Sequence, residues 1–178
     1  MDDQQIAAGI RAKDGEALRG LVERHGPGLY SFLVYRLGNR ADADDAYAEV
    51  LMKVWQHAES YQEKGRLKAW LFTIAHRTAL DRLRRQDPVG LTGGMESTAV
   101  SPEAGPDRQA ENKQVSERFQ KALAGLPGDQ REVFLMREYS GLSFAEIAQA
   151  LDCPLGTALA RMRYAVLKLR RQLEEFHA

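Results

Sequence analysis

Cysteine is almost absent from this chain: Cys153 stands alone in 178 residues, so no internal disulfide forms and no thiolate cluster can bind zinc. Charged residues interrupt every apolar stretch, so none is long enough to span a bilayer. The first twenty residues are acidic and lack the continuous apolar core of a secretory signal. Together these absences predict a cytoplasmic protein with no membrane insertion.

The residue patterns of a catalytic or cofactor site are also missing. No phosphate-binding glycine loop occurs, and Cys153 has no neighbouring base, so a packed turn residue is the better interpretation and a redox role stays open. The acidic group Asp42, Asp44 and Asp45 fits the first turn of a helix better than a cation site. We therefore expect no catalytic residue, no metal and no cofactor. The four histidines are scattered without the spacing of metal ligands: His25, His57, His76 and His177.

What the chain does have is an uneven distribution of charge. The formal net charge is zero, with 25 Lys and Arg against 25 Asp and Glu. Residues 1–50 hold nine acids and six bases, whereas residues 53–85 hold eight bases and three acids. Residues 155–173 hold five bases and no acid. Two basic patches on a neutral chain can bind phosphate locally, while the acidic front part calls for a different partner.

The sequence predicts an all-α protein with two small helical domains. Residues 87–113 contain three prolines and four glycines, which is typical of a flexible linker between domains at 1–86 and 114–178. If extended, this linker would span roughly 90 Å. The same linker motivates the hypothesis of a compact free state, in which it loops back and the two domains hide their phosphate-binding faces. Apolar spacing predicts helices in the first domain near 4–14, 15–37, 42–60 and 67–86.

The second domain has the pattern of a helix-turn-helix. Pro127 opens a helix that Gly141 ends, and "SFAE" fits a capping box formed by Ser143 and Glu146. Asp152 suits the tight turn before the last helix because it tolerates left-handed backbone angles. On that helix one stripe is apolar and predicts the face packed on the core: Leu155, Leu159, Met162, Val166, Leu169 and Leu173. Thr157, Arg161, Tyr164, Lys168 and Arg171 fall on the opposite stripe.

The two domains together resemble the sigma factors of bacterial RNA polymerase, in the extracytoplasmic-function (ECF) group of the sigma-70 family. In the first domain the resemblance rests on "DADDAYAEVLMKVW" and "LKAWLFTIAHRTALDRLRR". In the second it rests on "LPGDQREVFLMREYSGLSFAEIAQALDCPLGT" and the basic helix that follows. The resemblance implies a region 2-like domain at 1–86 that binds core polymerase and the promoter −10 element, and a region 4-like domain at 114–178 that binds the −35 element. It also implies an anti-sigma factor as a partner.

The resemblance assigns the core-polymerase contacts to the β′ clamp helices and the β flap. Ala48 stands where the family commonly has glutamine. The residues implied to contact the β′ clamp helices are Asp45, Ala48, Glu49, Met52 and Lys53.

For the −10 element, the resemblance implies that the loop "ESYQEKGRL" captures an unstacked base while the following basic helix holds the DNA backbone. Opening a base pair costs a few kcal/mol, which contacts to the flipped base and the exposed strand offset. Arg77 stands where the family commonly has asparagine, which allows a different −10 preference. Trp70 matches a family tryptophan, and we expect it to pack in the core rather than to stack on a base. The implied contacts are Tyr61, Lys64, Arg66, Leu67, Lys68, His76, Arg77, Arg84 and Arg85.

For the −35 element, the last helix departs from the family's usual readers. Ala145, Leu159 and Ala160 stand where an acidic residue, a basic residue and a serine are frequent, and Tyr164 replaces an arginine. Because few side chains there can hydrogen-bond a base edge, we predict a different or weakly specified −35 sequence. Backbone N–H groups at the helix start can still hold a phosphate. The implied contacts are Phe144, Thr157, Leu159, Ala160, Arg161, Arg163, Tyr164 and Lys168.

The alternative is a helix-turn-helix transcriptional regulator that is not a sigma subunit. Such regulators usually dimerise, because two half-sites supply the affinity. No heptad for dimerisation occurs here, and this reading leaves the first domain unexplained. The sigma-factor interpretation accounts for both domains.

Overall fold

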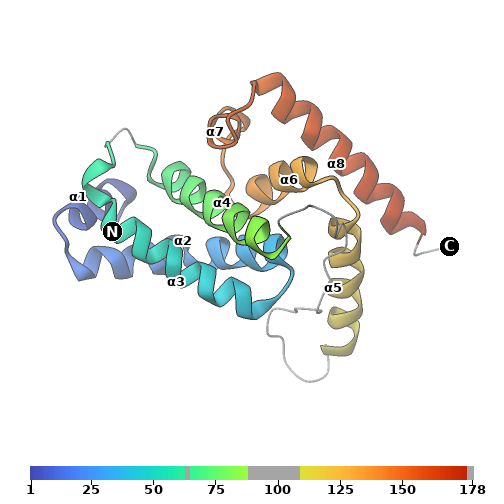
Figure 1. Ribbon diagram of the computed structural model, residues 1–178, viewed down its shortest axis with the longest axis horizontal. Coiled ribbons are helices and arrows are strands. Elements are labelled where there is room, and N and C mark those ends of the chain that lie inside the picture. The colour runs from blue at the N-terminus through green and yellow to red at the C-terminus, as the bar shows by residue number, and fades with distance from the viewer. Residues whose placement is uncertain (63–64, 88–108, 176–178) are drawn as a thin grey trace.

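The computed structural model describes residues 1–62, 65–87 and 109–175, and these contain helices and no strand (Figure 1). We call residues 1–87 the first module and residues 109–175 the second module. The helices of the first module are α1 (Asp3–Arg11), α2 (Gly15–Leu37), α3 (Arg40–Gln56), the short 3-10 helix η1 (Ala58–Ser60) and α4 (Leu67–Gln86). Those of the second module are α5 (Gln109–Ala124), α6 (Gly128–Ser140), α7 (Phe144–Ala150) and α8 (Leu155–Glu175). In none of these helices is an apolar run long enough to cross a membrane.

One predicted helix boundary is wrong. The helix expected over 42–60 ends at Gln56, because the His57 carbonyl accepts hydrogen bonds from the backbone N–H and hydroxyl of Ser60 and the chain turns into η1. Helix α5 begins at Gln109, within the last five residues of the stretch 87–113 that is expected to be the linker. The last Gly and Pro precede it, and residues 109–113 are compatible with a helix. Residues 88–108 of the linker lie outside the described residues.

The first module is a helical bundle built around one apolar core. Phe32 of α2 packs edge-to-face on Phe72 of α4, with ring centroids 5.7 Å apart. Val50, Val54 and Ala58 are buried in this core, whereas His57 is exposed. The core therefore fixes which side of α3 remains outside.

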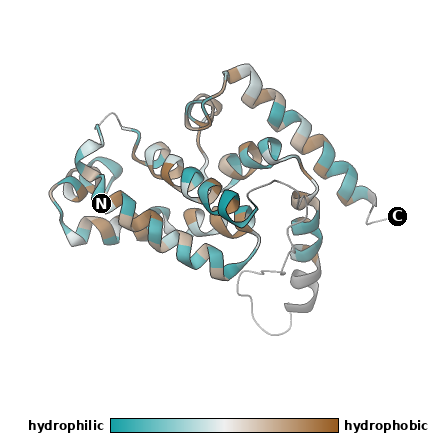
Figure 2. Ribbon diagram, in the orientation of Figure 1, coloured by the Kyte–Doolittle hydropathy of each residue, from teal (hydrophilic) through white to brown (hydrophobic). Residues whose placement is uncertain are grey.

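On α8 half of the stripe predicted to face the core does so: Leu169 is buried, and Met162 and Leu173 pack against the core partly buried. Ala158, Ala165 and Leu169 are buried against the rest of the second module, whereas Leu155, Leu159 and Val166 are between 44% and 48% exposed. Alanine has a small side chain, so α8 packs on α6 and α7 through the side that carries Ala158 and Ala165. Leu155 and Leu159 consequently face outward. Figure 2 shows that hydrophobic and hydrophilic residues alternate along α8.

The two modules pack on each other mainly through α2 and α6, with α7 beside α4 (Figure 1). At the crossing of α2 and α6, a Cβ atom on Gly28 would lie 2.4 Å from the Tyr139 carbonyl oxygen, so the backbones meet where only glycine fits. Tyr35 of α2 stacks on the Tyr139 ring at a centroid distance of 5.2 Å. The compact arrangement posed as a hypothesis from the sequence is thus the one the structure has.

A buried group of charges lies within this contact. Glu132 of α6 is 3% exposed; it forms an ion pair with Arg36 of α2 and its Oε1 lies 2.7 Å from Nδ1 of His76 of α4. Burial alone would raise the pKa of Glu132, but the hydrogen bond with His76 and the charge of Arg36 hold that pKa below its ordinary value. The carboxylate is therefore charged in the packed state and neutralised by two helices of the other module.

Removing this charge is expected to separate the modules. The change Glu132→Gln leaves the Arg36 guanidinium buried without its counter-charge, which costs about 3 kcal/mol where the contact persists. Water can solvate the Arg36 guanidinium once the modules separate. We therefore expect the variant to have a larger radius of gyration than wild type in small-angle scattering, with unchanged helical content. Wild-type protein should open likewise as the pH falls, because stability from a carboxylate with a lowered pKa is lost when the pH falls through that pKa.

The matched control is Glu138→Gln, which removes an exposed carboxylate from the same helix. This variant should stay as compact as wild type at neutral pH. An unchanged radius for the Glu132 variant would show that the buried charges do not hold the modules together.

Candidate polymerase and nucleic-acid interfaces

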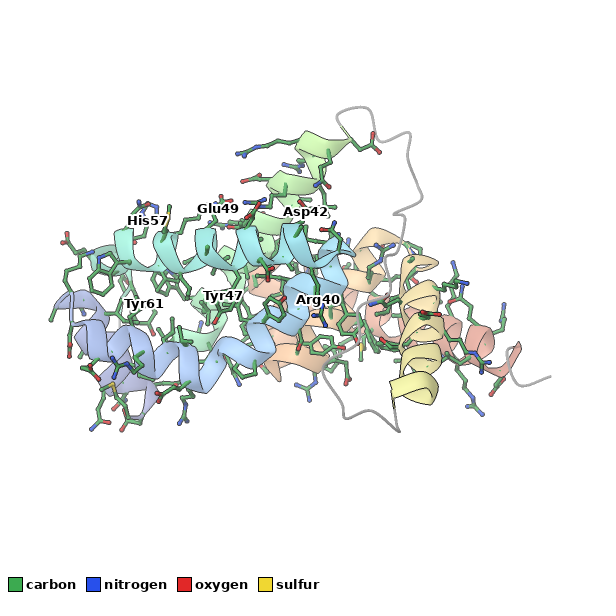
Figure 3. The ribbon with its side chains drawn as sticks, turned by 90° about the horizontal axis from the view of Figure 1, so that it is seen from below. Arg40, Asp42, Tyr47, Glu49, His57 and Tyr61 are labelled. Atoms are coloured by element: carbon green, nitrogen blue, oxygen red, sulfur yellow. The ribbon has the colours of Figure 1, made fainter. Side chains whose placement is uncertain are left out.

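The outer face of α3 carries the residues expected to contact core polymerase. Figure 3 shows Asp42, Glu49 and His57 along one edge of this helix, with Tyr47 on the opposite side toward α2. Met52 is 58% exposed and Asp45 and Ala48 are exposed on the same outer surface. Methionine is enriched in protein interfaces, so Met52 gives this face apolar area that a partner can cover.

Glu49 and Lys53, the other two expected contacts, are held by neighbours. Arg82 of α4 donates to Oε2 of Glu49 at 3.0 Å, and Lys53 lies 2.8 Å from its other oxygen. Burial would raise the pKa of Glu49, but these two cations keep the pKa below its ordinary value. Lys53 also donates to the Thr78 hydroxyl at 3.0 Å. These groups fix the position of α3 against α4. Asp45, which is 74% exposed and lies 3.9 Å from Arg82, shares the outer surface with Ala48 and Met52.

The loop expected to capture a −10 base lies between α3 and α4. Tyr61 is 5% exposed and packs on Trp70 with ring centroids 4.9 Å apart, so Trp70 has the packing role favoured by the sequence. Leu67 is 1% exposed in the core, and this burial removes it from the surface that DNA can reach. Lys64 lies outside the described residues.

A cavity of about 280 Å³ opens beside this loop, at its boundary with the second module. Tyr61, Arg66 and Trp70 line it from the first module, and Glu146 and Gln149 of α7 line it from the second. The Arg66 guanidinium donates to the Gln149 side-chain oxygen at 3.0 Å. Helix α7 therefore covers one side of the surface that the sequence assigns to the −10 element.

The remaining cations of α4 divide into two sets. Arg77, Arg84 and Arg85 are exposed, whereas Lys68 is half-buried and His76 is engaged by Glu132. A direct DNA contact by His76 therefore competes with the buried ion group. The exposed arginines give the far end of α4 the positive surface that binds phosphate.

The helix-turn-helix forms as the sequence predicts. The Ser143 hydroxyl accepts from the Glu146 backbone N–H at 3.2 Å, and the Glu146 carboxylate accepts from Ser143 N–H at 2.8 Å, which completes the capping box of α7. Asp152 has φ of 51° in the turn, and the Cys153 N–H bonds back to the Ala148 carbonyl at 2.9 Å. This turn places α8 at the surface, where Leu155 and Leu159 of its first two turns are exposed.

The residues expected to read the −35 element have different surroundings. Thr157 is half-buried, and Arg161 lies 3.1 Å from the Asp129 carboxylate of α6. The Arg137 guanidinium lies over the Phe144 ring, with its Cζ atom 5.1 Å from the ring centroid. The fully exposed members of the set are Leu159, Ala160, Arg163, Tyr164 and Lys168.

Three residues that shape these surfaces were missed by the sequence reading: Arg36, Asp129 and Glu132. One local signal pointed to Glu132, since it lies on the same helical face as Leu135 and Met136, and a charge on an apolar face requires a partner. Nothing local identifies that partner, because Arg36 precedes it by 96 residues. Within the described ranges, no three His, Cys, Asp or Glu side chains gather as a metal site.

Comparison with known proteins accounts for both modules. Residues 21–89 match the family Sigma-70 region 2, and residues 116–169 match Sigma-70, region 4. ECF RNA polymerase sigma factor SigL of Mycobacterium tuberculosis is 31% identical over 171 residues, covering 94% of this chain and 95% of SigL. RNA polymerase sigma factor CarQ of Myxococcus xanthus is 32% identical, covering 93% of this chain and 95% of CarQ.

Solved structures share the arrangement of the helices. CnrH in complex with the cytosolic domain of CnrY superposes with a TM-score of 0.73 at 23% identity, covering 97% of each chain. The sigma factor RpoE of Bartonella quintana, solved with the anti-sigma factor NepR, gives a TM-score of 0.72 at 27% identity over 88% of this chain and 96% of that one. The chain therefore belongs to the ECF RNA polymerase sigma factors of the sigma-70 family.

Proposed function

We propose that this chain binds core RNA polymerase through α3, holds a melted −10 strand with the loop and basic end of α4, and places α8 at the −35 element. The observation that carries this proposal is the joint placement of an exposed acidic and apolar face on α3 and exposed arginines on the adjacent α4. One face suits a protein and the other suits phosphate. Domain boundaries near 1–86 and 114–178 are part of the proposal.

For the polymerase contact we assign Met52, Asp45 and Ala48 to direct binding. Met52 supplies apolar area, and Asp45 supplies a charge that basic residues of the clamp helices can pair with. Glu49 and Lys53 support the same surface from within the ion-pair network with Arg82. A β-flap contact for the second module completes the attachment.

For the −10 element we assign the positive surface to Arg66, Arg77, Arg84 and Arg85, with Lys68 as a further contact. Lys64 belongs to the same assignment and lies outside the described residues. Tyr61 is next to the cavity, where its ring can stack on a flipped base once it is uncovered. Because α7 lies over this loop, strand capture requires α7 to move away from α4. An anti-sigma factor that favours the packed state would keep the protein inactive.

The nucleotide chemistry belongs to the polymerase in this account, so the chain acts without a catalytic residue or cofactor of its own. Action on a bacterial promoter places it in the cytoplasm. Because the two modules belong to one chain, the first DNA contact raises the effective concentration of the second.

The direct test is transcription from genomic DNA by purified core polymerase with and without this protein. We expect discrete new transcript 5′ ends that require the protein, each with shared sequence upstream. No new start sites, with active polymerase and a folded protein, would contradict the assignment.

A second test concerns the α3 surface. The change Met52→Glu places a charge in an apolar contact, so we expect at least about tenfold weaker binding of labelled full-length protein to core polymerase in fluorescence anisotropy. The control is Val115→Glu, which changes a similarly exposed apolar residue on α5. Equal affinity of the Met52 variant and wild type would remove α3 from the interface.

A further inference from the structure

The first two turns of α8 expose apolar side chains where a helix-turn-helix meets the bases. Leu155 is 48% exposed and Leu159 is 46% exposed, and they are one helical turn apart on the same side. Gly156 and Ala160 lie exposed next to them and add no bulk. The beginning of the second helix of such a motif is the part that enters the major groove. The leucines therefore stand where base edges are contacted.

The polar groups that ordinarily read bases are scarce at this end of the helix. Arg161 is the earliest arginine of α8, and its Nε lies 3.1 Å from the Asp129 carboxylate. Thr157 is half-buried. Direct readout by hydrogen bonds needs donors or acceptors in front of the base edges, and these two turns offer few. An apolar contact is the readout that remains.

The charges around the leucines identify the occupant as nucleic acid. Residues 155–173 hold five bases and no acid. Arg163 and Lys168 are exposed, and neither forms an ion pair with another described residue. Arg163 follows Leu159 by one helical turn, and a cation without a counter-charge beside an apolar patch fits a phosphate backbone.

We propose that Leu155 and Leu159 recognise thymine methyl groups in the −35 duplex. Thymine is the DNA base that presents an apolar group, the C5 methyl, in the major groove. The flanking cations hold the phosphates of the two strands and set the depth of α8. Burying one methyl against a leucine strengthens binding roughly fourfold. This inference rests on the proposed function, because it names the base feature that the −35 surface selects.

The test compares thymine with uracil, which differs from it by the C5 methyl alone. Holoenzyme assembled from core polymerase and the full chain first selects promoters from a random duplex library. The selected promoters are then rebuilt with uracil in place of thymine in the upstream element only, and the affinities are measured by competition. We expect enriched upstream thymines and binding that is roughly fourfold weaker for each critical methyl removed.

Variants assign the effect to named side chains. In Leu159→Ala and Leu155→Ala the ratio of thymine to uracil affinity should fall toward one. Leu167→Ala is the matched control, since Leu167 is 51% exposed on a different side of the same helix, and its ratio should equal that of wild type. All three positions are exposed, and circular dichroism checks that each variant keeps its helices.

Each of the other outcomes is decisive. Promoter binding with equal affinity for thymine and uracil overturns the methyl readout and leaves the sigma function intact. Weaker binding of Leu159→Ala to core polymerase without DNA assigns the leucines to a protein contact and overturns it as well. Failure to select any promoter would count against the proposed function itself.

Discussion

Glu132 is the charge on which the packing of the two modules depends. It is buried on α6, and its two partners, the Arg36 guanidinium and the His76 ring, come from two helices of the other module. A buried carboxylate is costly unless paired, so its presence requires α2, α4 and α6 to meet in one arrangement. Two further contacts join α2 to α6: Gly28 closely approaches the Tyr139 backbone, and the Tyr35 ring stacks on the Tyr139 ring.

This arrangement has opposite consequences for the two DNA surfaces. It places α7 over the loop that contains Tyr61 and lets Gln149 bond Arg66, so part of the −10 surface is covered. It leaves the outer side of α8 open to solvent, including Leu159, Arg163 and Tyr164. It also leaves Met52 of α3 exposed. The packed protein thus presents the surfaces proposed for polymerase and for the −35 element, while the surface proposed for the −10 element is partly covered.

Local signals predicted the helices well and the contacts between modules poorly. The capping box at Ser143 and the left-handed glycine at Gly141 fixed the ends of α6 and α7, because such signals act within a few residues. The burial of α8 was misjudged because leucine spacing defines an apolar stripe without saying what packs on it. Small residues at Ala158 and Ala165 decided that question. The pairing of Arg36 with Glu132 joins distant segments and has no periodic signature.

The most direct test of this account is a distance between the −10 loop and α7. Spin labels at Gln62→Cys and Gln149→Cys, in a chain with Cys153→Ser, report that distance in free protein and in the complex with core polymerase and promoter. The account predicts one short distance in the free protein and a longer one in the promoter complex. A distance that stays short in the complex would contradict it, as would a broad spread of distances in the free protein.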